Sequence, residues 1–207
     1  MNIQPIVEGH GEEPAVPVLL RRLCNEAQLW EIGINACIRC PRGKLLQEPE
    51  LRRRIRLARL QPQCAAILLL FDSDDDCPLE VAPRLKAWAQ DEASPIACDV
   101  VMAHREFEAW FLAAIESLRG RRGIRDDATS HFEPEQPRNA KARLEEQMQT
   151  GRTYMERADQ VALTAVFDLA TTYRRCRSFR KLTTAFGSLV ASMGYSLPEW
   201  PPPQWIV

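Results

Sequence analysis

The stretch CAAILLLF, residues 64–71, runs directly into the acidic residues DSDDD at 72–76. Its apolar positions are continuous rather than alternating, which is typical of a strand buried on both faces of a parallel sheet. A bilayer span needs about 20 apolar residues, so this run is too short to cross a membrane. We therefore predict a central strand at 65–71 that ends at a group of carboxylates.

The segments around this strand alternate between strand and helix patterns. Strands are predicted at 2–7, 32–38, 65–71 and 97–103, and helices at 13–28, 46–60, 79–91 and about 106–118. This order predicts βαβ units, which place parallel strands in one sheet with helices on its faces. The expected fold class is α/β, with a mostly parallel four-stranded sheet.

The chain changes character after residue 118. Residues 119–138 are polar and rich in Arg, Asp and Pro, which predicts a linker, and helical patterns follow at 139–149, 154–173 and 178–193. The last residues, EWPPPQWIV (199–207), predict a polyproline II strap in which Trp200 and Trp205 pack on the body. We thus predict an α/β domain at 1–118, and a linker and helical extension at 119–207 packed on it.

Composition narrows the class of protein. A chain of 207 residues with 45% hydrophobic and 27% charged residues is typical of an ordinary soluble domain. The net charge of −1 provides no global attraction to polyanions, so any nucleic acid must be held by local basic patches. We see no secretory signal pattern, and seven cysteines are an odd number, so we expect reduced thiols in the cytoplasm and no membrane association.

Two acidic segments follow strands of the predicted sheet. Glu8 ends the first strand within IVEGHGEE (6–13), and Asp72 to Asp76 follow the strand at 65–71. Ligands of open parallel sheets gather outside the carboxyl ends of the strands, so both segments are expected at one edge. Carboxylates brought together repel one another unless a cation lies between them, and Mg²⁺ or Mn²⁺ prefers oxygen ligands. The segments therefore predict a metal site, in which Gly9 and Gly11 leave space for a phosphate or a metal-bound water. The alternative for 72–76 is a solvated turn whose aspartate caps the next helix.

Four motifs together resemble a known group of proteins. VEGHGE (7–12), FDSDDD (71–76) and REFEAWFLA (105–113) are similar to motifs of the Toprim superfamily. With SFRK (178–181), they resemble more narrowly a bacterial stand-alone Toprim-like family of unknown function (number 4276), allied to the overcoming-lysogenisation-defect nucleases. The resemblance implies a Rossmann-like Toprim fold, metal-dependent cleavage of phosphodiesters, and a separate ATPase partner in an antiphage defence system.

The same resemblance assigns roles to individual acids. It implies that Glu8 is the superfamily's catalytic glutamate. It also implies that Glu106 and Glu108 match acids that, in the allied nucleases, lie after the strand that follows Asp72. The predicted metal ligands are Glu8, Glu12, Asp72, Asp74 and Glu106. Glu8 has an alternative role as the general base that activates the attacking water, and the sequence does not separate the two roles.

Basic residues are the predicted contacts to phosphate. Arg180 and Lys181 in SFRK are expected either to stabilise charge on a phosphate at the acidic edge or to pair with the acidic loops. The predicted nucleic-acid contacts are Lys44, after the second strand, and four arginines of the loop RGRRGIR, namely Arg119, Arg121, Arg122 and Arg125. The alternative is that these segments are solvated surface.

These features predict a Mg²⁺- or Mn²⁺-dependent nuclease or phosphodiesterase subunit that acts on nucleic acid. The alternative is a non-catalytic regulatory or binding subunit of an ATPase complex. A phosphatase with an aspartate nucleophile in Asp72-x-Asp74 fits less well, because such enzymes carry that motif after their first strand and here it follows the third predicted strand.

Overall fold

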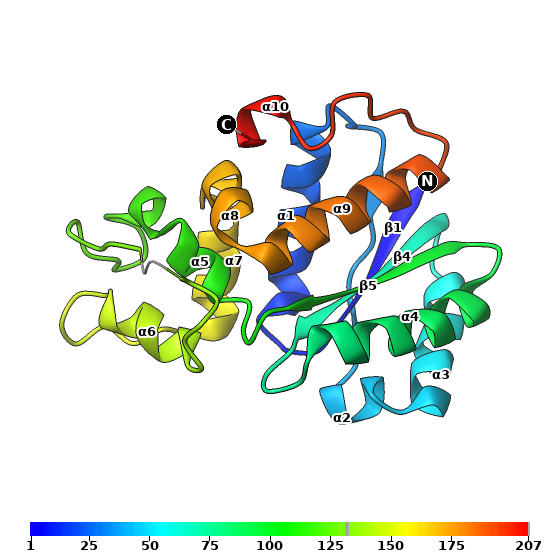
Figure 1. Cartoon of the computed structure of the whole chain (residues 1–207), viewed down its shortest axis with the longest axis horizontal. Coiled ribbons are helices and arrows are strands. Elements are labelled where there is room, and N and C mark those ends of the chain that lie inside the picture. Colours follow the sequence, from blue (N-terminus) through cyan, green and yellow to red (C-terminus); the bar gives the residue numbers. More distant parts are fainter. Residues whose placement is uncertain (131–132, 207) are drawn as a thin grey trace.

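The computed structural model describes residues 1–130 and 133–206, which form an α/β fold (Figure 1). The parts of the predicted linker at 131–132 and of the predicted strap at 207 lie outside the described residues. The strands are β1 (Asn2–Val7), β2 (Gly33–Ile34), β3 (Ile38–Arg39), β4 (Cys64–Asp72) and β5 (Ala97–Ala103). Every pairing is parallel, and the order is β2-β1-β4-β5 with β3 also paired to β1, a Rossmann-like arrangement.

The central position of β4 agrees with its continuous apolar sequence. Residues 66–71 are all buried, and Leu69 pairs with Ile6 of β1 on one side and Val100 of β5 on the other. The predicted strand at 32–38 is instead two short strands, so the sheet has five strands rather than four. Between β2 and β3 the side-chain amide of Gln4 donates to the carbonyl of Ala36, so a side chain takes the place of a backbone partner there.

Helices pack on both faces of the sheet (Figure 1). On one face, α1 (Glu12–Glu26) and α9 (Arg177–Ser192) bury their apolar residues with Val7, Leu68 and Val101. On the other face, α3 (Glu48–Arg59) and α4 (Pro78–Ala93) pack on Leu69 and Val100. The short helix α2 (Arg42–Leu45) links β3 to α3. The alternation of side chains along each strand explains why neighbouring residues join opposite cores.

The C-terminal half joins the first of these cores. It contains α5 (Ala109–Ala113), a 3-10 helix (Ile115–Leu118), α6 (Ala140–Glu146), α7 (Glu156–Thr164) and α8 (Leu169–Arg175). The helix predicted at 154–173 is divided into α7 and α8, because the Asp168 side chain accepts from the Thr171 amide and starts a new helix. Five aromatic rings in edge or tilted contact connect α5, the α7–α8 loop and α9, namely Phe107, Trp110, Phe111, Phe167 and Phe179.

The C-terminal tail lies on the body as predicted but with a different backbone. Trp205 is buried, and the indole N–H of Trp200 donates to the carbonyl of Thr183 at 2.8 Å. Residues Pro203–Ile206 form the short helix α10, so the polyproline II prediction is wrong for that turn. No helix in the described ranges is long and apolar enough to cross a membrane.

Candidate functional site

Four carboxyl groups lie together at the carboxyl ends of the strands, and we call them the acidic cluster. Glu8 follows β1, Glu12 begins α1, Asp72 ends β4, and Glu108 precedes α5. The side chains are close enough for Glu8 and Glu108 to raise the pKa of Glu12, and for Glu12 and Glu108 to raise that of Asp72. The sheet topology thus unites acids separated by up to a hundred residues, as parallel strands predict.

Backbone amides hold two members of the cluster in place. The amide of Gly9 donates to Oε2 of Glu12, which folds the first turn of α1 back toward β1. The amide of Phe107 donates to Oδ1 of Asp72 at 2.8 Å, which ties the end of β4 to the segment after β5. Both carboxylates are therefore oriented by the backbone around them.

The other two members keep an oxygen without a partner. Glu108 is fully buried, and its Oε1 accepts from the Tyr154 hydroxyl at 3.0 Å. Oε2 of Glu108 and Oε2 of Glu8 are buried and have no hydrogen-bond partner within residues 1–130 and 133–206. An unsatisfied buried carboxylate oxygen is costly, so these two atoms indicate a group that the protein chain does not supply.

Burial raises the pKa of every member of the cluster. For Glu12 and Glu108 the pKa rises to about 7, chiefly because burial disfavours the charged form. The pKa of Asp72 is well above its ordinary value, first because of burial and then because of neighbouring carboxylates. The pKa of Glu8 is also raised by burial, although Arg42 acts against this.

A lysine from the C-terminal half supplies positive charge to the cluster. Lys141 lies in α6, and its Nζ is 3.1 Å from Oε2 of Glu156. Burial alone would lower the pKa of Lys141, but Glu108, Glu156 and Asp72 outweigh that effect and raise it. The sequence contains no signal for this lysine, because its place depends on how α6 packs against α5.

Two predicted ligands lie next to the acidic cluster, since Asp74 acts to raise the pKa of Glu8 and Glu106 acts to raise that of Glu108. Asp74 has a backbone φ of 48°, its side chain is 57% exposed, and its Oδ2 is 3.3 Å from Nε of Arg42. Oε2 of Glu106 accepts from the backbone amide of Lys141 at 2.8 Å, so Glu106 stabilises the first turn of α6. Metal binding by Asp74 and Glu106 stays a prediction, and the fully buried Glu108 is a further acid at this site.

Arg42 rather than Lys44 reaches the acidic loop after β4. Its guanidinium donates to the carbonyls of Asp72 and Ser73 and to the carboxylate of Asp76. Lys44 is exposed on α2. Arg42 lies three residues after the end of β3, nearer to the strand than Lys44, and this position was the available signal for it.

The glycines of VEGHGE have a packing role that the sequence did not reveal. A Cβ atom on Gly11 would lie 1.8 Å from Oε1 of Gln160 and 2.6 Å from Cγ of Glu156. The absence of a side chain at Gly11 therefore lets α7 approach α1 closely, and this space does not serve a phosphate as predicted.

Of the two predicted phosphate contacts in SFRK, Arg180 makes hydrogen bonds within the protein and Lys181 is exposed. The guanidinium of Arg180 donates to the carbonyls of Tyr173 and Arg174, near the end of α8, and Lys181 is exposed on α9. Among the described residues, no contact joins the side chain of Arg180 or Lys181 to the acidic cluster. In SFRK the buried Ser178 has the structural role, since its hydroxyl accepts from the Trp110 indole at 2.8 Å.

The loop at 119–125 is also bound to the protein itself. Arg122 donates to Oδ1 of the fully buried Asp159, Arg119 donates to the carbonyl of Ala128, and Arg121 is exposed. A separate bond joins the Arg125 side chain to the Glu146 carbonyl. Nucleic-acid binding by this loop stays a prediction, with Arg121 the residue whose side chain is most available for it.

The donors of the acidic cluster fit a hard cation in chemistry. All are carboxylate oxygens, which Mg²⁺ and Mn²⁺ prefer, and two of those oxygens have no partner among the residues that the structure describes. Across the described residues, no three His, Cys, Asp or Glu side chains already form a ligand set. Binding a cation would therefore require these side chains to rotate toward a shared ion.

A family model with the description "Domain of unknown function (DUF4276)" matches residues 7–186. The matched range contains the whole acidic cluster and Lys141. No curated protein and no solved structure matches the chain.

Proposed function

The chain belongs to this family of unknown function, and we propose that it is a Toprim-type, Mg²⁺- or Mn²⁺-dependent nuclease or phosphodiesterase subunit that acts on nucleic acid. The observation that supports this best is the acidic cluster with its two unpartnered buried oxygens, on Glu8 and Glu108. Several carboxylates buried together repel one another, and a divalent cation with its bound water would remove that repulsion and provide partners for the free oxygens.

In this proposal the residues at the site have three different roles. Glu12, Asp72 and Glu108 would hold the ion, which would polarise a phosphate oxygen and lower the pKa of its bound water. Glu8 is half-buried, and its raised pKa suits a base that takes the proton of the attacking water. Lys141 would stabilise negative charge on the phosphate.

One observation favours the alternative, a non-catalytic regulatory subunit. Lys141 already brings an ammonium group among the carboxylates, and Glu12 and Glu108 with pKa values of about 7 each hold a proton part of the time near neutrality. The cluster is thus partly neutralised without a metal. A separate ATPase partner, and a place in antiphage defence, rest on the resemblance of the sequence motifs to the allied nucleases.

Metal titration of matched variants tests the proposal. Asp72→Asn removes the charge but keeps an oxygen that accepts from the Phe107 amide, whereas Asp75→Asn changes a carboxylate whose side chain is 73% exposed. Calorimetry with MnCl₂ should show binding by the wild type and Asp75→Asn, and at least about tenfold weaker binding by Asp72→Asn, a loss of about 1.4 kcal/mol.

Cleavage assays on plasmid, single-stranded DNA and RNA, with Mn²⁺ or Mg²⁺, then separate the two functions. Manganese-dependent cleavage that is lost in Asp72→Asn and Glu8→Gln supports the nuclease. Binding of Mn²⁺ without cleavage favours the regulatory subunit. A wild-type protein that binds neither Mn²⁺ nor Mg²⁺ refutes the metal site.

A further inference from the structure

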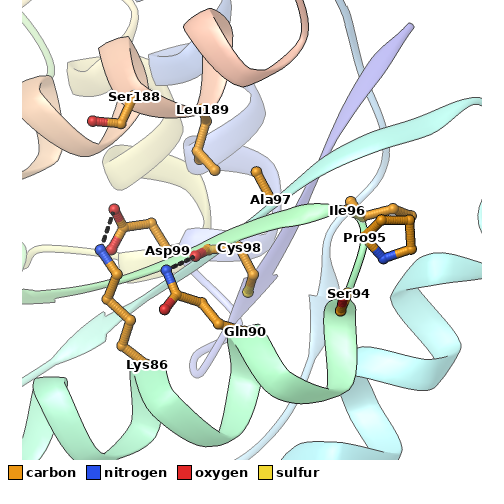
Figure 2. Close-up of a pocket in the computed structure, with 10 residues that line it drawn as sticks. All are labelled: Lys86, Gln90, Ser94, Pro95, Ile96, Ala97, Cys98, Asp99, Ser188 and Leu189. Carbon is orange, nitrogen blue, oxygen red and sulfur yellow. Dashed lines mark hydrogen bonds and ion pairs between the residues drawn. The ribbon is translucent and has the colours of Figure 1, made fainter.

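The outer side of β5 is an edge of the sheet. In the described chain β5 pairs with β4 and with no other strand. An edge strand presents free backbone N–H and C=O groups, which are a template for pairing with another strand. A cavity of about 330 Å³ opens along this edge between α4 and α9 (Figure 2). This edge is therefore available to another backbone unless side chains close it.

Two side chains occupy backbone groups of this edge. The side-chain amide of Gln90, from α4, donates to the carbonyl of Cys98 at 3.2 Å. Oδ1 of Asp99 accepts from the amide of Val100 at 2.8 Å. One acceptor and one donor of β5 are thus satisfied without a neighbouring strand.

Both groups face away from β4. Backbone groups of a strand alternate in direction from one residue to the next. The carbonyl of Ala103 accepts from the amide of Ser73, directly after β4, so residues 97, 99, 101 and 103 turn their backbone groups toward β4. The carbonyl of Cys98 and the amide of Val100 therefore belong to the open edge.

We infer that the backbone groups of this edge could pair with those of β5 in a second copy of the chain, with Asp99 at the centre of the pair. We also infer that the side chains of Lys86, Gln90 and Asp99 prevent this pairing. In an antiparallel pair whose two-fold axis passes Asp99, the carbonyl of Cys98 in each copy bonds to the amide of Val100 in the other. These are the two backbone groups that Gln90 and Asp99 occupy in the single chain.

Lys86 adds a barrier across the edge. Asp99 shares a face of β5 with Val101, which packs with α9, whereas α4 packs on the opposite face. Lys86 of α4 nevertheless places Nζ 2.9 Å from Oδ2 of Asp99, so its side chain passes around the outer side of β5 (Figure 2).

Charge opposes the same pairing. With the axis at Asp99, two copies of this carboxylate would stand directly opposite each other, with Cα atoms about 4.5 Å apart. Like charges at such positions destabilise a strand pair. The edge is therefore closed by hydrogen bonds, by a side chain that crosses it, and by repulsion between copies.

The test removes all three obstacles and measures the mass of the protein in solution. The triple variant Lys86→Ala, Gln90→Ala, Asp99→Thr should gain mass with concentration in light scattering, toward twice the wild-type value. A matched control is Gln61→Ala, because the side chain of this half-buried glutamine donates only to the Leu57 carbonyl, one turn earlier in the chain. Hydrogen exchange at high concentration should show new protection in residues 97–103.

A triple variant that unfolds cooperatively and keeps the wild-type mass at every concentration overturns the inference, and so does association without new protection of β5. If this variant does not fold, the triple variant Lys86→Ala, Gln90→Ala, Asp99→Asn decides. It removes the charge and the two other side chains but keeps an oxygen that accepts from the Val100 amide, so we expect weaker association, and an unchanged mass refutes the inference.

Discussion

The ionisation of Glu108 should limit the stability of the protein above neutral pH. Burial is the main cause that raises the pKa of this carboxyl from 4.5 to about 7. The folded state therefore holds the proton more tightly than the unfolded chain, and stability falls as the pH rises from about 4.5 through about 7. At about 1.4 kcal/mol for each tenfold change in proton affinity, the loss above pH 7 approaches about 3 kcal/mol.

Glu108→Gln tests this directly. Glutamine keeps an oxygen that accepts from Tyr154 and cannot ionise, so at about pH 8 the variant should be more stable than the wild type by up to about 3 kcal/mol. In a domain of this size that is about 6–12 °C in melting temperature. Near pH 4.5 the two proteins should be equally stable. Glu108 also raises the pKa of Glu12, so the two carboxyl groups titrate together. The gain in stability is therefore assigned to the pair and not to Glu108 alone.

Urea unfolding followed by circular dichroism at both pH values measures the effect. Glu146→Gln is the control, because this glutamate is exposed and pairs with Arg143 on the surface. If Glu108→Gln is no more stable than the wild type at pH 8, Lys141 compensates the charge of Glu108 completely and the reasoning is refuted. If the cluster binds Mn²⁺, the ion should stabilise the wild type at pH 8 more than the variant.

Two further substitutions test the C-terminal half. Asp159→Ala removes the fully buried carboxylate that Arg122 and Arg152 share and that accepts from the Met155 amide, and should cost about 2 kcal/mol in calorimetric unfolding. Trp205→Ala should cost about 3 kcal/mol or more because the ring is buried, whereas Trp30→Ala, at a side chain that is 68% exposed, should change stability by less than about 0.5 kcal/mol; an equal effect would contradict the packing of the tail.

The sheet could be predicted because each long strand carries its own signal. The continuous apolar run at 65–71 has one interpretation in an alternating α/β chain, and β5 has the bounds predicted for it, 97–103. The boundaries that failed depend on single side chains. Gln4 separates β2 from β3, and Asp168 ends one helical segment and begins the next. The hydrophobic periodicity of a sequence is an average over many residues, so it does not predict a boundary that depends on one hydrogen bond.

The candidate site was predictable only where its residues follow strands. Glu8 and Asp72 were predicted because they lie at the carboxyl ends of β1 and β4, where the topology alone determines position, whereas Glu12 was predicted from the resemblance of the motif VEGHGE. Lys141 and its segment have no such constraint. The pattern at 139–149 predicted a helix, but nothing in it indicated which edge of the sheet that helix would reach.

The acidic cluster is therefore completed by both halves of the chain. The α/β half supplies the carboxylates, and the C-terminal half supplies the ammonium of Lys141 and the hydroxyl of Tyr154. Without these two groups, Glu108 would lose its hydrogen bond to Tyr154, and Glu108 and Asp72 would lose the positive charge of Lys141. A buried carboxylate without such partners is costly, so the C-terminal half contributes to the electrostatics of the site as well as to the core.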